Sequence, residues 1–323
     1  MSTPSPKNLR VPYETAGFKK SSPIRNGPGS LPTCWDDILW AAVTVGRPSR
    51  AYVFKHKDAS AYEALFRWSA VRMALEGRGH GASRLRRTAA VRSLDPTEKG
   101  AISYFLGMTF AKLFASELLK VPWLLHLDVF KDQVAAVLTE RSRPDLVGED
   151  AAGQWIAVEC KGRSARPDTE TTDKAKRQAK RIKSIGGKKP RYHIATFTYF
   201  ADHLLHFAWE DPEPDENEPE PIRLTVPGDA WKQYYGPVLG LLRSREGAVD
   251  RVLDGEREPI EEADVRVGVH PEVMRLLLEE DWGGARELAN EKAGEWDFRA
   301  DGIVVEAGQA WSGVRTGWWV DGG

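Results

Sequence analysis

Residues 141–164, RSRPDLVGEDAAGQWIAVECKGRS, form two apolar runs joined by a polar turn. Side chains on a β-strand point alternately to opposite faces, so Glu159 and Lys161 share one face while Cys160 points to the other. If the two runs pair as an antiparallel hairpin through EDAAGQ, Asp145 comes to lie near Glu159. The stretch therefore predicts a hairpin that brings two carboxylates and one ammonium together.

This grouping suits a metal-dependent hydrolase. Two carboxylates can bind Mg²⁺ while the ion keeps part of its water shell. The ion lowers the pKa of a bound water, and a nearby lysine can orient or deprotonate that water. The alternative is an exposed Glu/Lys pair on an edge strand, which is a common arrangement. The order of the surrounding helices and strands distinguishes a metal site from such a pair.

One long helix is expected before the hairpin, at 95–120. Asp95 can cap it, Pro96 suits its first turn, and Glu98 stands where it closes a capping box. Its apolar residues run nearly all round, so it should be buried. The remaining expected elements are strands at 122–130, 143–148, 155–162 and 191–200 and a helix at 172–186 that ends at Gly186. The order α-β-β-β-α-β predicts an α/β or α+β unit.

With its motif at Pro144-Asp145 and Glu159-Cys160-Lys161, this unit resembles the PD-(D/E)xK nuclease superfamily. The resemblance implies a restriction-endonuclease-like core, which is a central mixed sheet flanked by helices. It implies that Asp145 and Glu159 bind Mg²⁺, for which Mn²⁺ is expected to substitute. The backbone carbonyl of Cys160 would complete the metal site, and Lys161 would act on the water.

Two further residues are candidates for the catalytic site. Gln178 lies on the apolar stripe of the second helix, where a buried amide must find a partner. Some branches of the superfamily carry a Gln in this helix, so Gln178 is either a site residue or a satisfied amide. The same resemblance implies that Glu98 could be part of the metal site. The capping box, however, explains a glutamate at this position without any role in catalysis. Glu117 is a possible substitute for Glu98.

Positive charge is concentrated after the motif. From residue 161 to residue 191 the chain holds twelve Lys and Arg against three acids, a local balance of +9. Such a run is often a solvated face, but beside a metal site it favours a surface that follows phosphates. The candidate nucleic-acid-binding residues are Arg163, Lys174, Arg177, Lys180 and Arg181. The expected partner is DNA, with RNA left open.

The rest of the chain divides by composition. We expect a flexible arm over the first 30 residues and a helical region up to residue 90, with GRGHG as a solvated connector. The nuclease core is assigned to 91–209 and an α+β region to 221–323, where Asp301 falls in an ordinary strand. Between them, 210–220 holds seven acids and three prolines, which indicates a linker that could shield the basic surface.

Composition limits the functional class. The net charge of the 323 residues is −1 and there are only two cysteines, so a disulfide framework is excluded and a reducing cytoplasm is expected. No membrane span or zinc site is expected. The sequence predicts a DNA endonuclease of a bacterial restriction or anti-phage defence system, acting alone, as a homodimer or with a partner protein. The alternative is a non-catalytic or partner-activated nucleic-acid-binding subunit of a defence or repair complex.

Overall fold

The computed structural model describes residues 6–45, 58–78, 83–135, 143–213 and 221–312. The large sheet contains β1 (Leu9–Ala16), β2 (Gly27–Thr33), β3 (Leu75–Arg78), β4 (Ser83–Arg87), β5 (Trp123–His126), β6 (Leu146–Glu149), β7 (Trp155–Gly162), β9 (Tyr192–Ala201) and β10 (Leu204–Glu210). The helices around it are α1 (Trp35–Thr44), α2 (Asp58–Ala74), α3 (Ala89–Ser93), α4 (Pro96–Leu119), α5 (Lys131–Ala135) and α6 (Thr169–Lys180). The C-terminal elements are α7 (Lys232–Arg243), α8 (Ala248–Leu253), α9 (Pro271–Leu278), α10 (Trp282–Glu291), β12 (Glu258–Ile260), β13 (Val265–Val269) and β14 (Ile303–Ala307).

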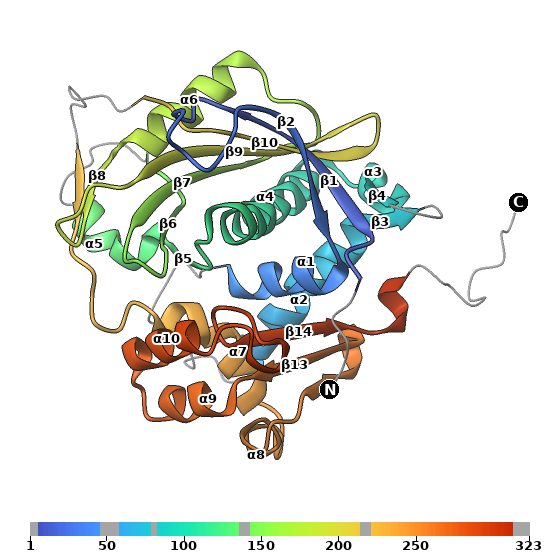
Figure 1. Cartoon of the computed structure of the whole chain (residues 1–323). Helices are drawn as coiled ribbons and strands as arrows, with labels where there is room; N and C mark the ends of the chain where they lie inside the picture. The colour runs from blue at the N-terminus through green and yellow to red at the C-terminus, as the bar shows by residue number, and fades with distance from the viewer. Residues whose placement is uncertain (1–5, 46–57, 79–82, 136–142, 214–220, 313–323) are drawn as a thin grey trace, which may run out of the picture.

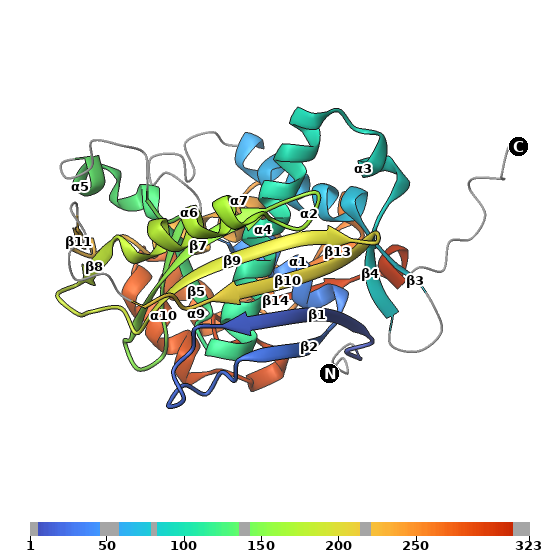
Figure 2. The same ribbon diagram turned by 90° about the horizontal axis from the view of Figure 1, so that it is seen from above.

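The elements form layers around a nine-stranded mixed sheet, ordered β2-β1-β4-β10-β9-β7-β6-β5, with β3 paired to β4. Figure 1 shows α4 against one face of this sheet, α6 against the other, and the C-terminal elements beyond α1 and α2. Viewed from above, the β1–β2 hairpin lies beside β10 and β9 (Figure 2). The mixed α/β class expected from the sequence is therefore confirmed.

The central hairpin forms as the alternating pattern predicts. β6 and β7 pair antiparallel, with Leu146 opposite Val158, and β7 continues parallel to β9. The turn is closed by Asp150, whose side chain accepts from the backbone N–H of Ala152 and Gln154, and by Gly153 in the left-handed region. This register places Asp145, one residue before β6, beside the second half of β7.

Helix α4 begins with the predicted capping box. The Asp95 side chain accepts from the backbone N–H of Thr97 and Glu98, and the Glu98 carboxylate accepts from the Asp95 N–H. Among the described residues, α4 alone is long and apolar enough to cross a bilayer, and most of that stretch is buried inside the protein. The helix is followed by three antiparallel strands, a helix and a parallel strand, which is the predicted order with the short helix α5 and one short strand inserted. The strand expected at 122–130 is shorter than predicted, because β5 ends at His126 and residues 127–130 form a 3-10 helix.

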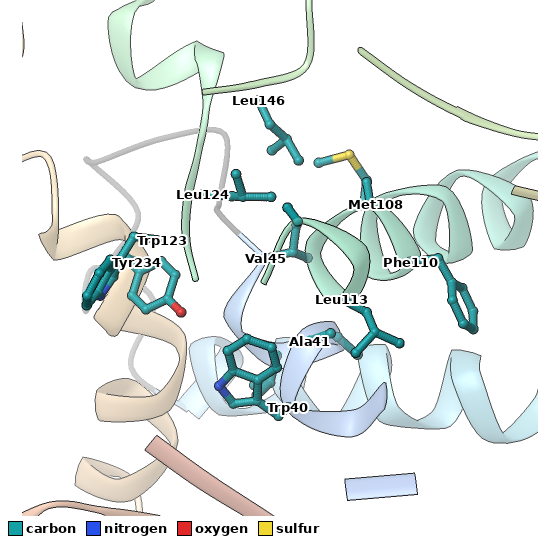
Figure 3. Packing of buried hydrophobic residues seen from close by; sticks show 14 of the residues in the cluster. Trp40, Ala41, Val45, Met108, Phe110, Leu113, Trp123, Leu124, Leu146 and Tyr234 are labelled. Atoms are coloured by element: carbon teal, nitrogen blue, oxygen red, sulfur yellow. The ribbon is translucent and has the colours of Figure 1, made fainter. Parts of the chain in front are cut away.

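One large hydrophobic core joins α4 to both neighbouring layers. Figure 3 shows Met108 of α4 facing Leu124 of β5 and Leu146 of β6, and Trp123 of β5 beside Tyr234 of α7. A smaller cluster on the opposite face of the sheet contains Ala175 of α6 and Phe197 of β9. The site described below lies where α4 meets the end of β7, between these two packed layers.

Three local expectations were wrong. Residues 9–33 are a hairpin, because alternate residues of β1 are buried and the prolines of β2 are tolerated on an edge strand. The segment after α2 forms the β3–β4 hairpin instead of a connector, with 79–82 outside the described residues. Helix α6 ends at Lys180, and β8 (Ile182–Ile185) follows, because its two isoleucines are buried where it pairs with β11 (Ile222–Leu224).

The C-terminal region is α+β, as expected. Strands β12, β13 and β14 form a separate antiparallel sheet, with α7 to α10 around it. The strand expected around Asp301 is β14, which begins two residues after it at Ile303. Most of the acidic segment, 214–220, lies outside the described residues.

Candidate active site

Asp145 is fixed in place by backbone contacts from β7 and from the residue that follows β5. Its N–H donates to the Val158 carbonyl at 3.1 Å, and its own carbonyl accepts from the Leu127 N–H at 2.8 Å. Its carboxylate atom Oδ2 accepts from the Cys160 N–H at 2.8 Å. The aspartate therefore sits at the end of the β6–β7 ladder, with its carboxylate turned toward β7.

Glu159 is the most deeply buried acid of the site, with 0% of its surface exposed. Its Oε1 contacts the Lys161 ammonium, while its Oε2 is buried, accepts from no donor in the described part of the chain, and can share a proton with the Asp145 carboxylate. Burial, and secondly the charge of Asp145, raise the pKa of Glu159 to about 8. Burial also raises the pKa of Asp145. Asp145, Glu159 and Lys161 thus lie together, as the sequence predicts. The two acids are so close that both carboxylates are not easily ionised at the same time.

The donor set fits a hard divalent cation. Glu159 Oε2 and the Asp145 carboxylate converge, and a cation would relieve their repulsion. The N–H and C=O of one strand residue point to the same side, so the Cys160 carbonyl faces the side of β7 on which Asp145 lies. No group of three His, Cys, Asp or Glu side chains with metal-ligand geometry occurs in the described ranges. An ion here would depend on two carboxylates, one backbone carbonyl and water.

Two glycines allow α4 to approach the end of β7. A Cβ added to Gly162 would collide with the backbone of Ser103 and Tyr104, and one added to Gly107 would lie 2.8 Å from the Gly162 backbone nitrogen. Because Gly162 directly follows Lys161, this contact fixes the lysine against the turn of α4 that carries Tyr104.

Tyr104 and His126 are site residues that the sequence pattern does not reveal. The Tyr104 hydroxyl lies 3.5 Å from His126 Nε2, and His126 Nδ1 accepts from the backbone N–H of Asp128 at 3.2 Å. Burial raises the pKa of Tyr104, and the nearby charge of Asp145 acts in the same direction. Burial lowers the pKa of His126. Since α4 is apolar on almost every side, its periodicity gave no sign that position 104 faces the acids.

Gln178 reaches the loop that leads into the motif. The residue is 7% exposed, and its Nε2 donates to the Arg143 carbonyl at 3.2 Å, while its Oε1 is a buried oxygen without a partner in the described residues. Arg143 in turn contacts the carboxylate of Asp128. Gln178 therefore supports the segment that positions Asp145, and a direct role in catalysis stays a prediction.

Glu98 and Glu117 lie away from the contact between α4 and β7. Glu98 is about 9 Å before Tyr104 along the helix, and its carboxylate caps the first turn. Glu117 is about 20 Å beyond Tyr104, and it pairs with Lys7 at 2.9 Å and with Arg299 at 3.5 Å. The capping contact explains why a glutamate stands at position 98. The predicted role of Glu98 in a metal site stays a prediction.

The basic helix α6 presents some of its predicted cations to solvent. Lys174, Arg177 and, in the preceding loop, Arg163 are exposed, whereas Lys180 and Arg181 are half-buried. Lys176, which lies between the exposed positions, is paired with Glu210 at 2.5 Å. Lys174 and Arg177 are therefore the cations of α6 best placed to meet a phosphate backbone.

In comparisons with protein-family models, curated proteins and solved structures, the chain matches none. The functional conclusion therefore depends on the residues and their geometry.

Proposed function

We propose that the protein is a Mg²⁺-dependent nuclease that hydrolyses phosphodiester bonds, with Asp145, Glu159 and Lys161 as its central residues. The observation that carries this proposal is the buried Glu159 carboxylate, which has one oxygen on Lys161 and the other beside the Asp145 carboxylate with no donor to satisfy it in the described residues. A buried acid pair is costly to a fold, and it is a common feature of catalytic sites. The resemblance to the PD-(D/E)xK superfamily supports the same proposal.

Each residue has a definite task in this reaction. A bound Mg²⁺ would supply charge neutralisation at the phosphate and a more acidic water. Asp145 and Glu159 would hold the ion, with the Cys160 carbonyl as a further ligand. Lys161, whose side chain is 21% exposed, lies at the open side of the acids, where its ammonium can orient the attacking water and donate to a phosphate oxygen. The Tyr104 hydroxyl and His126 border the same place.

The proposed substrate is DNA, with RNA as the alternative. Lys174 and Arg177 are exposed on α6, the helix whose Gln178 reaches the motif loop, so a phosphate backbone bound there would pass the acids. We further propose that the protein acts in the cytoplasm of a bacterium as a restriction or anti-phage effector. That role follows only from the resemblance.

Cleavage of supercoiled plasmid tests the proposal. The wild type should nick or linearise it in Mg²⁺ and in Mn²⁺, and chelator should stop the reaction. Asp145→Asn and Lys161→Met should lower the rate at least about 100-fold. Asp173→Asn, at an exposed acid of α6, is the matched control and should cut like the wild type. A wild type that is inactive in every metal while it still binds DNA would instead support a non-catalytic or partner-activated subunit.

A further inference from the structure

The described part of the chain exposes four large apolar side chains, and three of them are aromatic. Tyr62 is 67% exposed, Phe66 50% and Tyr104 42%. Phe66 and Tyr104 both pack against Phe105, with ring centroids 5.1 Å and 5.6 Å apart, and Tyr62 lies one turn before Phe66 on α2. We call one continuous group on this surface the aromatic platform; its members are Tyr62, Phe66, Tyr104 and Phe105. Exposed apolar groups of this kind commonly mark a binding surface.

The platform begins at the edge of the candidate active site. The Tyr104 hydroxyl lies 3.5 Å from His126 Nε2, and the charge of Asp145 acts on it. The hydroxyl end of Tyr104 therefore points toward the acids while its ring stays open to solvent. A ring held at one end in this way is a rigid surface with little rotational freedom left to lose on binding.

The opposite border of the site is basic. A line of contacts runs from His126 to Asp128, from Asp128 to Arg143, and from the Arg143 carbonyl to Gln178 of α6. Exposed Lys174 and Arg177 lie on that helix. The acids are thus flanked by aromatic rings on one side and by cations on the other.

This arrangement matches a nucleic-acid strand whose bases are unpaired. In a duplex the faces of the bases are stacked on one another, so exposed rings have nothing to contact. An unpaired strand offers phosphates to cations and base faces to aromatic side chains, and such stacking tolerates any base. We propose that the aromatic platform stacks unpaired bases next to the scissile phosphate. This inference rests on the proposed nuclease function, and it names the substrate class as single strands or frayed and flapped ends.

A protein partner or a second copy of the chain is the competing occupant of the platform. The continuity of the rings with the acids through Tyr104 favours a nucleic-acid strand, because only a substrate has to reach both. Charge complementarity with α6 favours it too. A protein partner would need apolar surface and would tolerate leucine in place of an aromatic ring, whereas base stacking would not.

Fluorescence anisotropy in chelator measures binding without cleavage. The probes are labelled dT20, labelled rU20 and a blunt DNA hairpin duplex. Tyr62→Leu and Phe66→Leu keep the positions apolar and remove the ring, and Met73→Ala, at the fourth exposed apolar residue, is the control on the same helix. Each leucine variant should bind dT20 about 5-fold or more weakly, with little change for the duplex. Met73→Ala should bind like the wild type, and the rU20 arm shows whether the platform also accepts RNA.

The platform and the nuclease proposal can fail separately. Unchanged single-strand binding in both leucine variants would overturn the platform, even if plasmid cleavage succeeds. Size-exclusion chromatography tests the competing occupant. If the wild type is a dimer and Phe66→Glu is a monomer, the platform binds a second copy of the chain and the stacking proposal is overturned. Ring-dependent binding of dT20 by a protein that cuts no nucleic acid in any metal would keep the platform and reject the nuclease.

Discussion

Gly162 lies so close to the Ser103 carbonyl that no side chain fits between β7 and α4 at that point. The contact joins the strand that carries Glu159 and Lys161 to the helix that carries Tyr104. The catalytic geometry therefore depends on a glycine outside the motif. Two backbones packed this tightly cannot move apart without moving the lysine.

Gly162→Ala should disturb both stability and activity. The added methyl would push α4 away from β7, at a cost of about 2–3 kcal/mol in unfolding free energy, and would displace Lys161. Gly100→Ala is the matched control, because a Cβ there meets nothing within 4 Å and alanine favours a helix. Urea unfolding and plasmid cleavage measure the two effects. Equal stability and activity in the two variants would refute the close packing.

Glu159→Gln should stabilise the metal-free protein at high pH while abolishing cleavage. The pKa of Glu159 is raised in the folded state from its usual 4.5 to about 8. Between these values the unfolded chain releases the proton and the folded protein keeps it, so wild-type stability should fall as pH rises from about 5 to 8. At pH 8.5 the variant should exceed the wild type by about 2–4 kcal/mol.

Thermal and urea unfolding in chelator at pH 5.5 and pH 8.5 check this expectation. The difference between Glu159→Gln and the wild type should be small at pH 5.5 and largest at pH 8.5. A wild type whose stability is independent of pH over this window, or a variant that loses stability at pH 8.5, would contradict the burial of the acid pair.

Mg²⁺ affinity should rise with pH for the same reason. The ion competes with the proton on Glu159, so binding releases a proton and becomes tighter as pH rises from 6 to 8. Isothermal calorimetry in two buffers of different ionisation enthalpy measures both the affinity and the proton release. Asp145→Asn should remove the binding, and affinity that does not change with pH would argue against Glu159 as a ligand.

Lys174→Ala and Arg177→Ala should weaken DNA binding without changing stability. Each removes one exposed phosphate contact, so the slope of log affinity against log salt should decrease by about 1 for each. Arg275→Ala, at an exposed arginine of α9, is the matched control. An unchanged salt slope in both α6 variants would show that this helix is only a solvated face.

Asp301 holds the C-terminal region to the core, which the sequence did not indicate. The residue is fully buried, and its Oδ2 accepts from Trp40 Nε1 at 2.8 Å and from the Tyr234 hydroxyl at 2.6 Å. Asp301→Ala removes the acceptor of Trp40 Nε1 and of the Ile303 N–H, while the Tyr234 hydroxyl keeps only the Pro122 carbonyl, and it should cost about 3–5 kcal/mol in unfolding free energy. Asp254→Ala, at an exposed acid, should change it by less than about 0.5 kcal/mol. Denaturant unfolding distinguishes the two.

Local patterns were enough to predict the hairpin and the acid pair. Alternation fixes which side chains of β7 share a face, and the short polar turn fixes the register that brings Asp145 to Glu159. The capping box at Asp95 likewise predicted where α4 begins. These features depend on residues that lie close together in the chain, so they can be predicted from a single sequence.

Tertiary contacts account for what the sequence did not predict. Tyr104 and His126 meet because α4 crosses the sheet at Gly162, and no periodicity encodes that crossing. The N-terminal segment was predicted to be flexible because it is rich in Pro, Gly and Ser. In the structure it is ordered by pairing with β10, a strand almost 200 residues later in the chain.

The decisive experiment measures plasmid cleavage by the wild type and by Glu159→Gln in Mg²⁺, with DNA binding measured on the same preparations. We expect metal-dependent cleavage by the wild type and no cleavage by Glu159→Gln, although the variant is folded and binds DNA as tightly. Cleavage by Glu159→Gln at the wild-type rate would contradict it.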